Sequence, residues 1–364
     1  MSHLSCGIVG LPNVGKSTLF NALTRKQIPS ENYPFCTIDP NVGIVPVKDE
    51  RLQQLSTQSK SQKIIPATVT FVDIAGLVKG ASEGAGLGNQ FLTHIRETDA
   101  IIQVVRCFID DDVIHVSGRV DPLDDIETIQ LELILADLQM VENTISRMEK
   151  QVKSKKELIA TLEFLKKAAE HLNQNLPLRK LPLTAEEETF AALYPFLTKK
   201  KMLYVCNVGE QDLPSMENPL VERVRAYAAA ENSSVLPICA RLEEEISQLD
   251  EKDALEFLAS LGLKESGLDR LIKEAFHLLG LITYITTGEI ETRAWTIHQG
   301  TPAAVAAGKI HSDIEKGFIR AEVVNYADMI HYKGRVGAKE AGKARSEGRE
   351  YIVQDGDVIL FYHN

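Results

Sequence analysis

The chain has 364 residues, of which 44% are hydrophobic, so it has room for two or three domains with apolar cores. It carries 51 acidic and 40 basic residues and a formal net charge of −11, which argues against general electrostatic binding of nucleic acid. No stretch reaches the roughly 18 apolar residues of a membrane span, and no charged leader precedes the first strand-like run. Five cysteines without C-x-x-C spacing are typical of buried residues in a reducing compartment. We therefore expect a cytoplasmic protein without a membrane partner.

The first motif occupies residues 10–17, which read GLPNVGKS and match the phosphate-binding loop G-x-x-x-x-G-K-[ST]. An apolar run at 6–10 predicts a buried strand before it, and residues 18–24 predict the first turns of a helix. In that setting, backbone N–H groups and the positive end of the helix dipole bind polyphosphate. Lys16 would reach the outer phosphates and the Ser17 hydroxyl would ligate Mg²⁺. The nucleotide-binding residues expected here are Asn13, Val14, Gly15, Lys16, Ser17 and Thr18.

Five more short runs rich in apolar or β-branched residues predict strands at 41–47, 67–73, 100–106, 202–207 and 235–240. Helical stretches lie between them. The sequence therefore predicts an α/β fold with a doubly wound, mostly parallel sheet, whose ligand binds at the carboxyl ends of the strands.

A second motif, D-x-x-G, follows the predicted strand at 67–73. Its carboxylate, Asp73, would hold Mg²⁺ through a water, and the N–H of Gly76 would meet the γ-phosphate. Thr37 lies where such proteins place a hydroxyl that closes on the metal in the triphosphate state. Residues 80–88 contain four glycines and are the candidate switch, because ordering so many glycines costs much backbone entropy.

A long insertion separates the predicted strands at 100–106 and 202–207. Apolar residues from 134 to 152 recur at heptad spacing, a Lys-rich break follows at 153–157, and the heptad pattern resumes from 158 to 172. This pattern predicts an antiparallel coiled-coil hairpin. The seam would either pack onto the core or, as we expect of a helix pair with a Lys-rich tip, project as an arm.

From about residue 281 the pattern changes to a compact α+β module. Strands are predicted at 291–297, 317–324, 351–353 and 357–362, with a small-residue helix at 301–307 and a tight turn at 355–356. No catalytic constellation is visible there, which favours a binding role. Six basic against two acidic residues between 333 and 349 form either a solvated face or a contact for nucleic acid.

Four segments, at 10–17, 32–38, 73–90 and 307–321, together resemble the YchF subfamily of Obg-related P-loop proteins, and the resemblance runs from end to end. It implies an Obg-type nucleotide domain (1–125 and 202–280), an inserted helical arm (126–201) and a carboxy-terminal TGS module with a β-grasp fold (281–364). It further implies ATP hydrolysis, association with ribosomes, and a role in translation or stress control.

The base would be read by residues after the predicted strands at 202–207 and 235–240. GTP-specific relatives use N-K-x-D, whose carboxylate accepts hydrogen bonds from guanine, whereas this chain has Asn207, Val208 and, in place of Asp, the longer Glu210. The Asn207 amide can still meet the N6/N7 edge of adenine, so we expect ATP to bind better than GTP. Cys239 and Ala240 would line the base.

Hydrolysis should be slow, because Leu77 occupies the position where many GTPases carry a water-orienting glutamine. The catalytic candidates are two histidines, His94 and His115, of which the resemblance favours His115. Asn13 matches related K⁺-dependent hydrolases, so its side chain would help to hold K⁺ against the phosphates.

Three functions stay open. The first is an ATP-driven, ribosome-associated switch, the second a nucleotide-sensing adaptor in which turnover is incidental, and the third a GTP-dependent translation factor. The Lys-rich arm tip and residues 333–349 would touch rRNA, and a cleft between the arm and the TGS module would accept nucleic acid.

Overall fold

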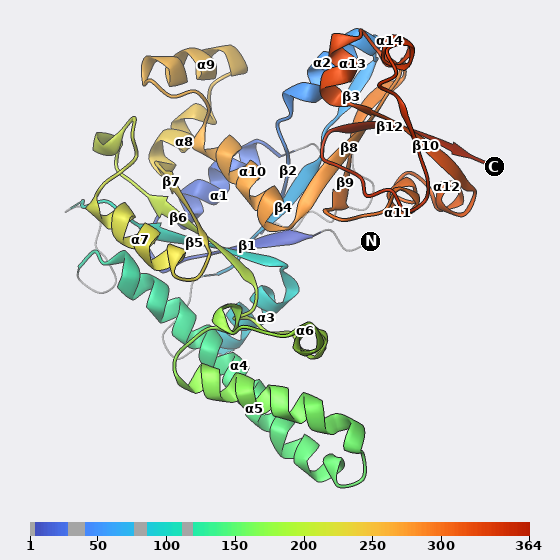
Figure 1. The fold of residues 1–364 in the computed structure, drawn as a ribbon. Helices are drawn as coiled ribbons and strands as arrows, with labels where there is room; N and C mark the ends of the chain where they lie inside the picture. The colour runs from blue at the N-terminus through green and yellow to red at the C-terminus, as the bar shows by residue number, and fades with distance from the viewer. Residues whose placement is uncertain (1–3, 28–40, 76–85, 111–118) are drawn as a thin grey trace. The chain divides into compact units, whose positions relative to one another are not determined.

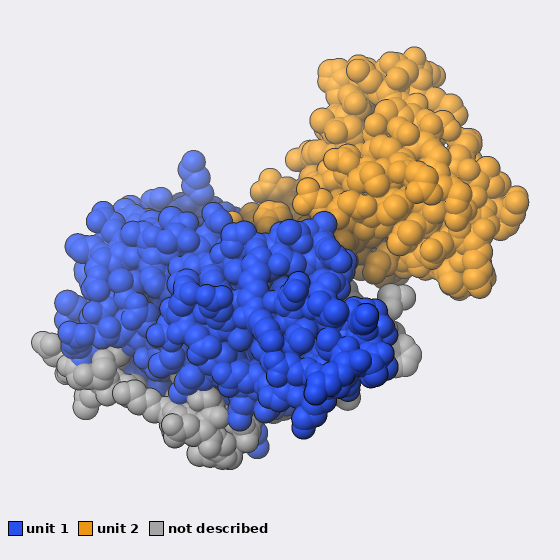
Figure 2. Space-filling view, turned by 60° about the horizontal axis from the view of Figure 1, so that its bottom comes forward, with its two compact units in different colours: residues 1–43, 70–271 blue, residues 44–69, 272–364 orange. Residues whose placement is uncertain are grey.

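The computed structural model describes residues 4–27, 41–75, 86–110 and 119–364, and groups the chain into two compact units (Figure 2). Unit 1 contains residues 1–43 and 70–271, and unit 2 contains residues 44–69 and 272–364. Four residues named above lie outside the described residues: Thr37, Gly76, Leu77 and His115. The division of the chain into nucleotide domain, arm and TGS module at the stated boundaries stays a prediction.

A six-stranded sheet, of which all strands but β2 and the start of β4 lie in unit 1, confirms the predicted strands and the α/β fold class. Its strand order is β2-β4-β1-β5-β6-β7, and β1 pairs in parallel with both β4 and β5 (Figure 1). Parallel pairing continues from β5 through β6 to β7. The strands are β1 (Ser5–Val9), β2 (Val42–Pro46), β4 (Thr68–Asp73), β5 (Ala100–Arg106), β6 (Lys201–Asn207) and β7 (Ser234–Ile238).

Helices that connect these strands pack against the sheet. One apolar cluster joins the strands to five of the helices, including the first half of the long helix α4. Local sequence defines several helix starts. For example, Asn218 accepts hydrogen bonds from the N–H groups of Leu220 and Val221, and Pro219 opens the helix behind it. The helices are α1 (Lys16–Arg25), α3 (Gly86–Glu97), α4 (Pro122–Val152), α7 (Pro219–Ala229), α8 (Ala240–Ile246), α9 (Glu251–Ser260) and α10 (Gly267–Leu278).

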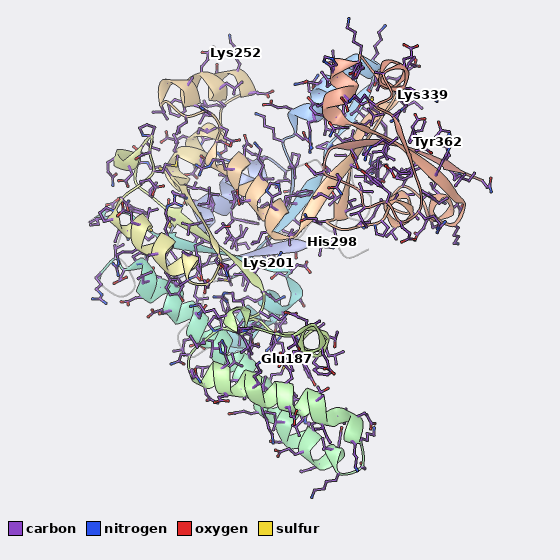
Figure 3. The ribbon with its side chains drawn as sticks, viewed as in Figure 1. Glu187, Lys201, Lys252, His298, Lys339 and Tyr362 are labelled. Atoms are coloured by element: carbon purple, nitrogen blue, oxygen red, sulfur yellow. The ribbon has the colours of Figure 1, made fainter. Side chains whose placement is uncertain are left out.

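The predicted helical hairpin is confirmed, with unequal helices. Helix α4 has 31 residues and α5 (Ile159–Asn173) has 15, and a turn at 153–158 joins them. The first half of α4 belongs to the sheet core through residues such as Ile129, whereas Val141 and the second half pack against α5. A third helix, α6 (Ala185–Ala191), begins at a capping box in which Glu187, labelled in Figure 3, also binds Lys167 at 2.8 Å.

Two buried polar contacts hold the base of this arm within unit 1. The carboxylate of Asp137 on α4 accepts hydrogen bonds from the N–H groups of Leu197 and Thr198, at 2.9 and 2.8 Å. Arg179 forms an ion pair of 2.8 Å with Glu231, whose other oxygen accepts the Tyr204 hydroxyl at 2.6 Å. Removing one partner of either contact would leave a buried charge without compensation, so both contacts stabilise the base of the arm.

Unit 2 is a second six-stranded sheet, of order β11-β10-β12-β8-β9-β3. Its apolar core lies between the sheet and the small-residue helix α11 (Ala303–Ala307), as predicted, with Pro302 at the helix N-cap. The strands are β3 (Lys63–Ile65), β8 (Leu281–Thr287), β9 (Glu291–His298), β10 (Phe318–Asn325), β11 (Arg345–Glu347) and β12 (Asp357–His363), and the other helices are α12 (Ser312–Lys316), α13 (Tyr326–His331) and α14 (Arg335–Glu340).

The expected strand at 351–353 is reduced to a single bridge between Ile352 and Pro302. The Asp357 carboxylate accepts the Gln354 N–H at 2.9 Å, and Gly356 has a φ of 82°. The chain therefore turns before a ladder can extend, and the next strand begins at Asp357.

Residues 50–65 complete this second sheet, which the sequence did not predict. Strand β3 pairs in parallel with β9, with Ile64 opposite Thr292, and helix α2 (Glu50–Ser59) packs on β8 and β9. Further bonds reinforce the pairing, among them the Ser61 hydroxyl to the Gly288 carbonyl at 2.6 Å. A segment from the first fifth of the chain is thus part of unit 2.

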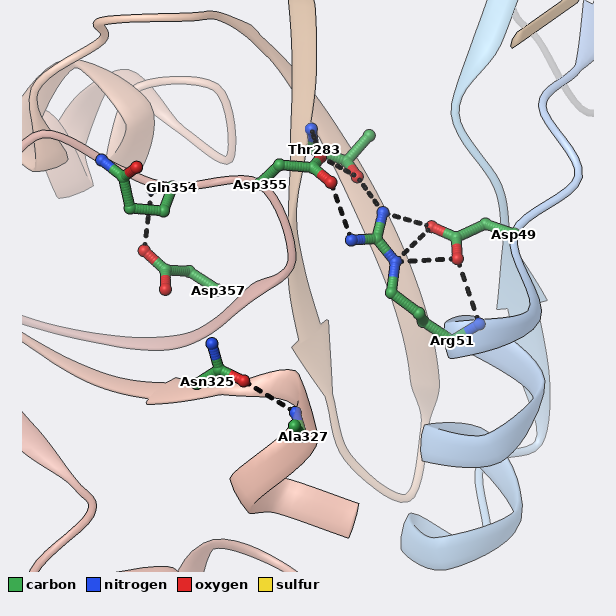
Figure 4. Close-up of polar contacts among 8 residues, drawn as sticks. All are labelled: Asp49, Arg51, Thr283, Asn325, Ala327, Gln354, Asp355 and Asp357. Atoms are coloured by element: carbon green, nitrogen blue, oxygen red, sulfur yellow. Dashed lines mark hydrogen bonds and ion pairs between the residues drawn. The ribbon is translucent and has the colours of Figure 1, made fainter.

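Arg51 at the start of α2 links this segment to the turn before β12 (Figure 4). Its guanidinium binds Asp49 at 2.8 Å, Asp355 at 2.8 Å and the Thr283 hydroxyl at 3.2 Å. A Cβ on Gly356 would lie 2.6 Å from the Arg51 guanidinium and would displace it, and the positive φ of this residue also favours glycine. In the described part of the chain, no helix is long and apolar enough to cross a membrane.

Candidate nucleotide-binding site

The phosphate-binding loop follows β1 and ends at the start of α1. Asn13 and Gly15 adopt left-handed backbone conformations, with φ of 64° and 94°. A Cβ on Gly15 would lie 2.2 Å from the Asn207 amide nitrogen, so only glycine fits. Helix α1 starts at Lys16 without an acidic residue in its first turn. Its N-terminal N–H groups can therefore receive an anion.

Lys16 and Asp73 form an ion pair across the two phosphate motifs. The side chains retain only 11% and 21% of their exposure, respectively. Sheet register explains the contact, because Ile8 on β1 lies opposite Asp73 at the end of β4. The pair satisfies both charges, and a bound polyphosphate with a divalent cation would offer each of them a partner of opposite charge.

Asn207 connects three parts of the site. It ends β6, is 6% exposed, and its amide nitrogen donates to the Val14 carbonyl at 2.9 Å. Its amide oxygen accepts the Ala240 N–H at 3.0 Å. The side chain thus ties the phosphate-binding loop to the start of α8, a positioning contact that sequence reasoning, which gave the amide to the base, did not foresee.

A pocket of 540 Å³ opens beside the loop within unit 1. Glu210 lies at its wall and forms an ion pair of 3.1 Å with Arg241, with side chains 53% and 76% exposed. A pocket of this size accommodates a nucleoside. It is lined by Asn13, Gly15, Thr18, Phe108, Ile109, Asp110, Asn207, Val208, Gly209, Glu210, Gln211, Cys239, Ala240, Arg241 and Glu244.

Cys239 and Ala240 line this pocket at the N-terminus of α8, as the sequence suggested. Burial raises the pKa of the Cys239 thiol, so it stays protonated and unreactive. The other described cysteines, at 6, 107 and 206, are also buried and free.

Sequence reasoning missed part of the pocket lining. Phe108, Ile109 and Asp110 follow β5, and Arg241 lies in the first turn of α8. Their position directly after the carboxyl ends of strands was the available signal. His94, the alternative catalytic candidate, is exposed on α3.

The described residues fit Mg²⁺ at the junction of the two motifs. Within residues 4–27, 41–75, 86–110 and 119–364, no group of three or more His, Cys, Asp or Glu side chains could hold a metal by itself. Mg²⁺ does not need one, because it is usually bound by one or two protein oxygens together with phosphates and waters. Ser17 supplies a hydroxyl and Asp73 a carboxylate beside the phosphate-binding loop.

Two family profiles match the chain. Residues 5–162 match the family described as "50S ribosome-binding GTPase", and residues 281–364 match the YchF-GTPase C-terminal family, described as a protein of unknown function (DUF933). The "Ribosome-binding ATPase YchF" of Bacillus subtilis is 54% identical over 363 residues, which cover 99% of each chain. This chain belongs to the YchF family. The protein of the same name from Escherichia coli O157:H7 is 54% identical over 360 residues, with the same coverage.

Solved structures agree with the YchF fold. The Schizosaccharomyces pombe YchF GTPase has a TM-score of 0.88 and 37% identity, covering 100% of this chain and 98% of that one. A GTP-binding protein from Pyrococcus horikoshii, at 20% identity and a TM-score of 0.63, shares the fold. The family resemblance noted in the sequence is therefore confirmed over the whole chain.

Proposed function

We propose that this protein binds ATP in preference to GTP, hydrolyses it slowly with Mg²⁺, and acts as a cytoplasmic, ribosome-associated switch in translation or stress control. The Glu210–Arg241 ion pair in the base pocket carries the nucleotide preference. Guanine needs a free carboxylate to accept its N1–H and exocyclic amine, whereas the Glu210 side chain is longer than the Asp of N-K-x-D and one of its oxygens pairs with Arg241. Adenine presents an acceptor at N1 and loses nothing.

Each motif residue has a role in this proposal. Lys16 and the N–H groups of α1 bind the phosphates, and Gly76 meets the γ-phosphate. Mg²⁺ is held by Ser17, Thr37 and, through a water, Asp73, and it neutralises charge on the phosphates. Asn13 would help to hold K⁺, a role that predicts faster turnover in KCl than in NaCl.

Competition between ATP and GTP for the purified protein tests the nucleotide preference. Wild-type protein should bind ATP more tightly than GTP. Arg241→Ala should lower the ratio of the GTP to the ATP dissociation constant, because it frees Glu210 for guanine. A matched control is Arg223→Ala, which removes an exposed arginine of α7 that pairs with Asp121. Tighter binding of GTP by the wild-type protein would overturn the proposal and favour a GTP-dependent factor.

Ribosome association is proposed because the Bacillus and Escherichia relatives, at 54% identity, are named as ribosome-binding ATPases. The arm tip offers exposed Lys153, Lys155 and Lys156 to an rRNA surface. Residues 333–349 offer less charge, because Arg335 and Lys339 both pair with Glu322 within unit 2. Neutralising the three arm lysines to glutamine should weaken co-sedimentation with ribosomes and flatten its salt dependence. Unchanged co-sedimentation would exclude the arm tip.

The adaptor alternative is separated from the switch by two variants. Lys16→Ala should abolish nucleotide binding, whereas His115→Ala should retain binding and lose hydrolysis. If His115→Ala kept full turnover, the catalytic role of His115 would be wrong. If it lost turnover yet still supported growth under stress as the wild type does, the adaptor function would be favoured.

A further inference from the structure

Arg106 has the largest fully buried side chain among the described residues, and the function proposed above assigns it no role. It is the last residue of β5 and is 1% exposed. Burying a guanidinium is costly unless its donors are satisfied, and a strand end in an apolar core needs no arginine for packing. The cost indicates a task that a smaller or apolar side chain would not perform.

The guanidinium of Arg106 bonds the segment that follows it. Its Nε donates to the Phe108 carbonyl at 3.1 Å, and one Nη donates to the Asp110 carbonyl at 3.0 Å. The guanidinium carbon also lies 4.5 Å from the centre of the Phe108 ring. The Arg106 guanidinium thus contacts the carbonyls of Phe108 and Asp110 and the Phe108 ring at the same time. The compact ammonium of lysine does not reproduce this geometry.

The segment held in this way, residues 108–110, is one wall of the 540 Å³ pocket. Its preceding residue is already anchored, because the Cys107 N–H donates to the Asn207 carbonyl at 2.8 Å and the Cys107 carbonyl accepts the Asn218 amide at 2.8 Å. After Cys107 the chain no longer pairs with the sheet, and the buried Arg106 side chain supplies the hydrogen bonds to residues 108–110.

Arg106 and Asn207 are register partners at the ends of β5 and β6. Asn207 holds the phosphate-binding loop to the start of α8, and Arg106 holds the other wall. We infer that Arg106 is a positioning residue that fixes residues 108–110 as the wall of the base pocket. This inference rests on the proposed function, since it assigns Arg106 to binding of the nucleoside and not of the triphosphate.

The decisive comparison is between ATP and inorganic tripolyphosphate, which carries the phosphates without a nucleoside. For Arg106→Lys, titration calorimetry with Mg²⁺ should show ATP binding weakened about tenfold, the effect of losing one charge-assisted hydrogen bond. Tripolyphosphate binding should remain within about twofold of wild type. In turnover, KM should rise while kcat is kept. Arg106→Met should weaken ATP binding further than Arg106→Lys, and Arg223→Lys is the matched exposed control.

Two results would overturn the inference: an ATP affinity that Arg106→Lys leaves unchanged, or an equal loss of affinity for ATP and tripolyphosphate, which marks a purely structural role. If the variants fail to fold, amide exchange in the wild-type protein decides. ATP should slow exchange at residues 108–110, tripolyphosphate should not, and equal exchange with the two ligands would refute the role. Failure of the wild-type protein to bind ATP would instead refute the proposed function.

Discussion

The two sheets of this protein draw their strands from the chain in different ways. In the first sheet, strands and helices alternate, and the residues proposed to bind phosphate and Mg²⁺ lie at or directly after the ends of β1 and β4. In unit 2, the last strand and a covering helix come from residues 50–65, and Ser61 meets Thr292 across a separation of 231 residues. A function built on local motifs is readable from the sequence, whereas a sheet completed from afar is not.

The family profile for the C-terminal region sharpens this contrast. It begins at residue 281 and therefore omits α2 and β3. The sheet that it describes depends on residues between the predicted metal residue Thr37 and Asp73 of the nucleotide site. The C-terminal module is thus composite, because it includes a segment that a sequence-based boundary assigns elsewhere.

The largest expected effect is on the isolated module. A fragment of residues 272–364 should not fold alone, because it lacks β3 and the helix that covers β8 and β9. Co-expression with residues 44–69 should restore dispersed amide signals in NMR spectra and cooperative melting. If residues 272–364 folded fully without residues 44–69, the second sheet would not need its distant segment, and the contrast between the two sheets would be wrong.

A matched pair of glycine substitutions compares the units directly. Gly15 and Gly356 both have positive φ, and an added Cβ would meet Asn207 and Arg51, respectively. Gly15→Ala should abolish ATP binding and leave unit 2 intact. Gly356→Ala should lower the free energy of unfolding of unit 2 by about 2 kcal/mol or more and leave ATP affinity unchanged. Calorimetric titration measures ATP binding and thermal unfolding measures the stability of unit 2. Loss of ATP binding in Gly356→Ala, or destabilisation of unit 2 in Gly15→Ala, would contradict the comparison.

Arg51 should have a smaller effect than either glycine. Arg51→Ala leaves Asp49 and Asp355 without their shared partner, and we expect a loss of about 1 to 2 kcal/mol in the free energy of unfolding of unit 2. Arg51→Lys should recover only part of it, since the compact ammonium of lysine lacks the planar fork with which the guanidinium reaches Asp49, Asp355 and Thr283 together. Urea unfolding checks the expected order of the free energy of unfolding, which should fall from wild type to Arg51→Lys to Arg51→Ala. Equal stability of all three would make the cluster of Figure 4 incidental.

The smallest effect concerns Glu243 in unit 1, which accepts the Gly267 and Leu268 N–H groups at 2.6 and 3.1 Å. Burial raises the pKa of this carboxyl above its ordinary value of 4.5. The folded protein therefore holds its proton to higher pH than the unfolded chain, and stability falls as pH rises from about 4.5 through the folded pKa. Glu243→Gln should remove this slope, and the exposed Glu256→Gln should keep it. A slope that persists in Glu243→Gln would contradict the assignment.

The phosphate-binding half of the site was predictable because its chemistry depends on neighbours in sequence. Strand, loop and helix follow one another within residues 5–25, and the positions of Gly15 and Lys16 in the motif are enough to predict their roles in the phosphate-binding loop. The helical hairpin was readable for the same reason, since its heptad spacing is local. Its unequal helices were not, because half of α4 packs on a sheet whose strands lie elsewhere in the chain.

Tertiary contacts decided the rest. No local pattern indicates that the Asn207 amide bonds Val14 and Ala240, that Arg241 pairs with Glu210, or that Arg106 donates to the carbonyls of Phe108 and Asp110. Charged side chains take whichever partner the fold brings within reach, and parallel sheets gather strand ends from distant parts of the chain. The order of motifs therefore established a phosphate site and a family, while the pairing of β3 with β9 and the walls of the base pocket exist only in the folded protein.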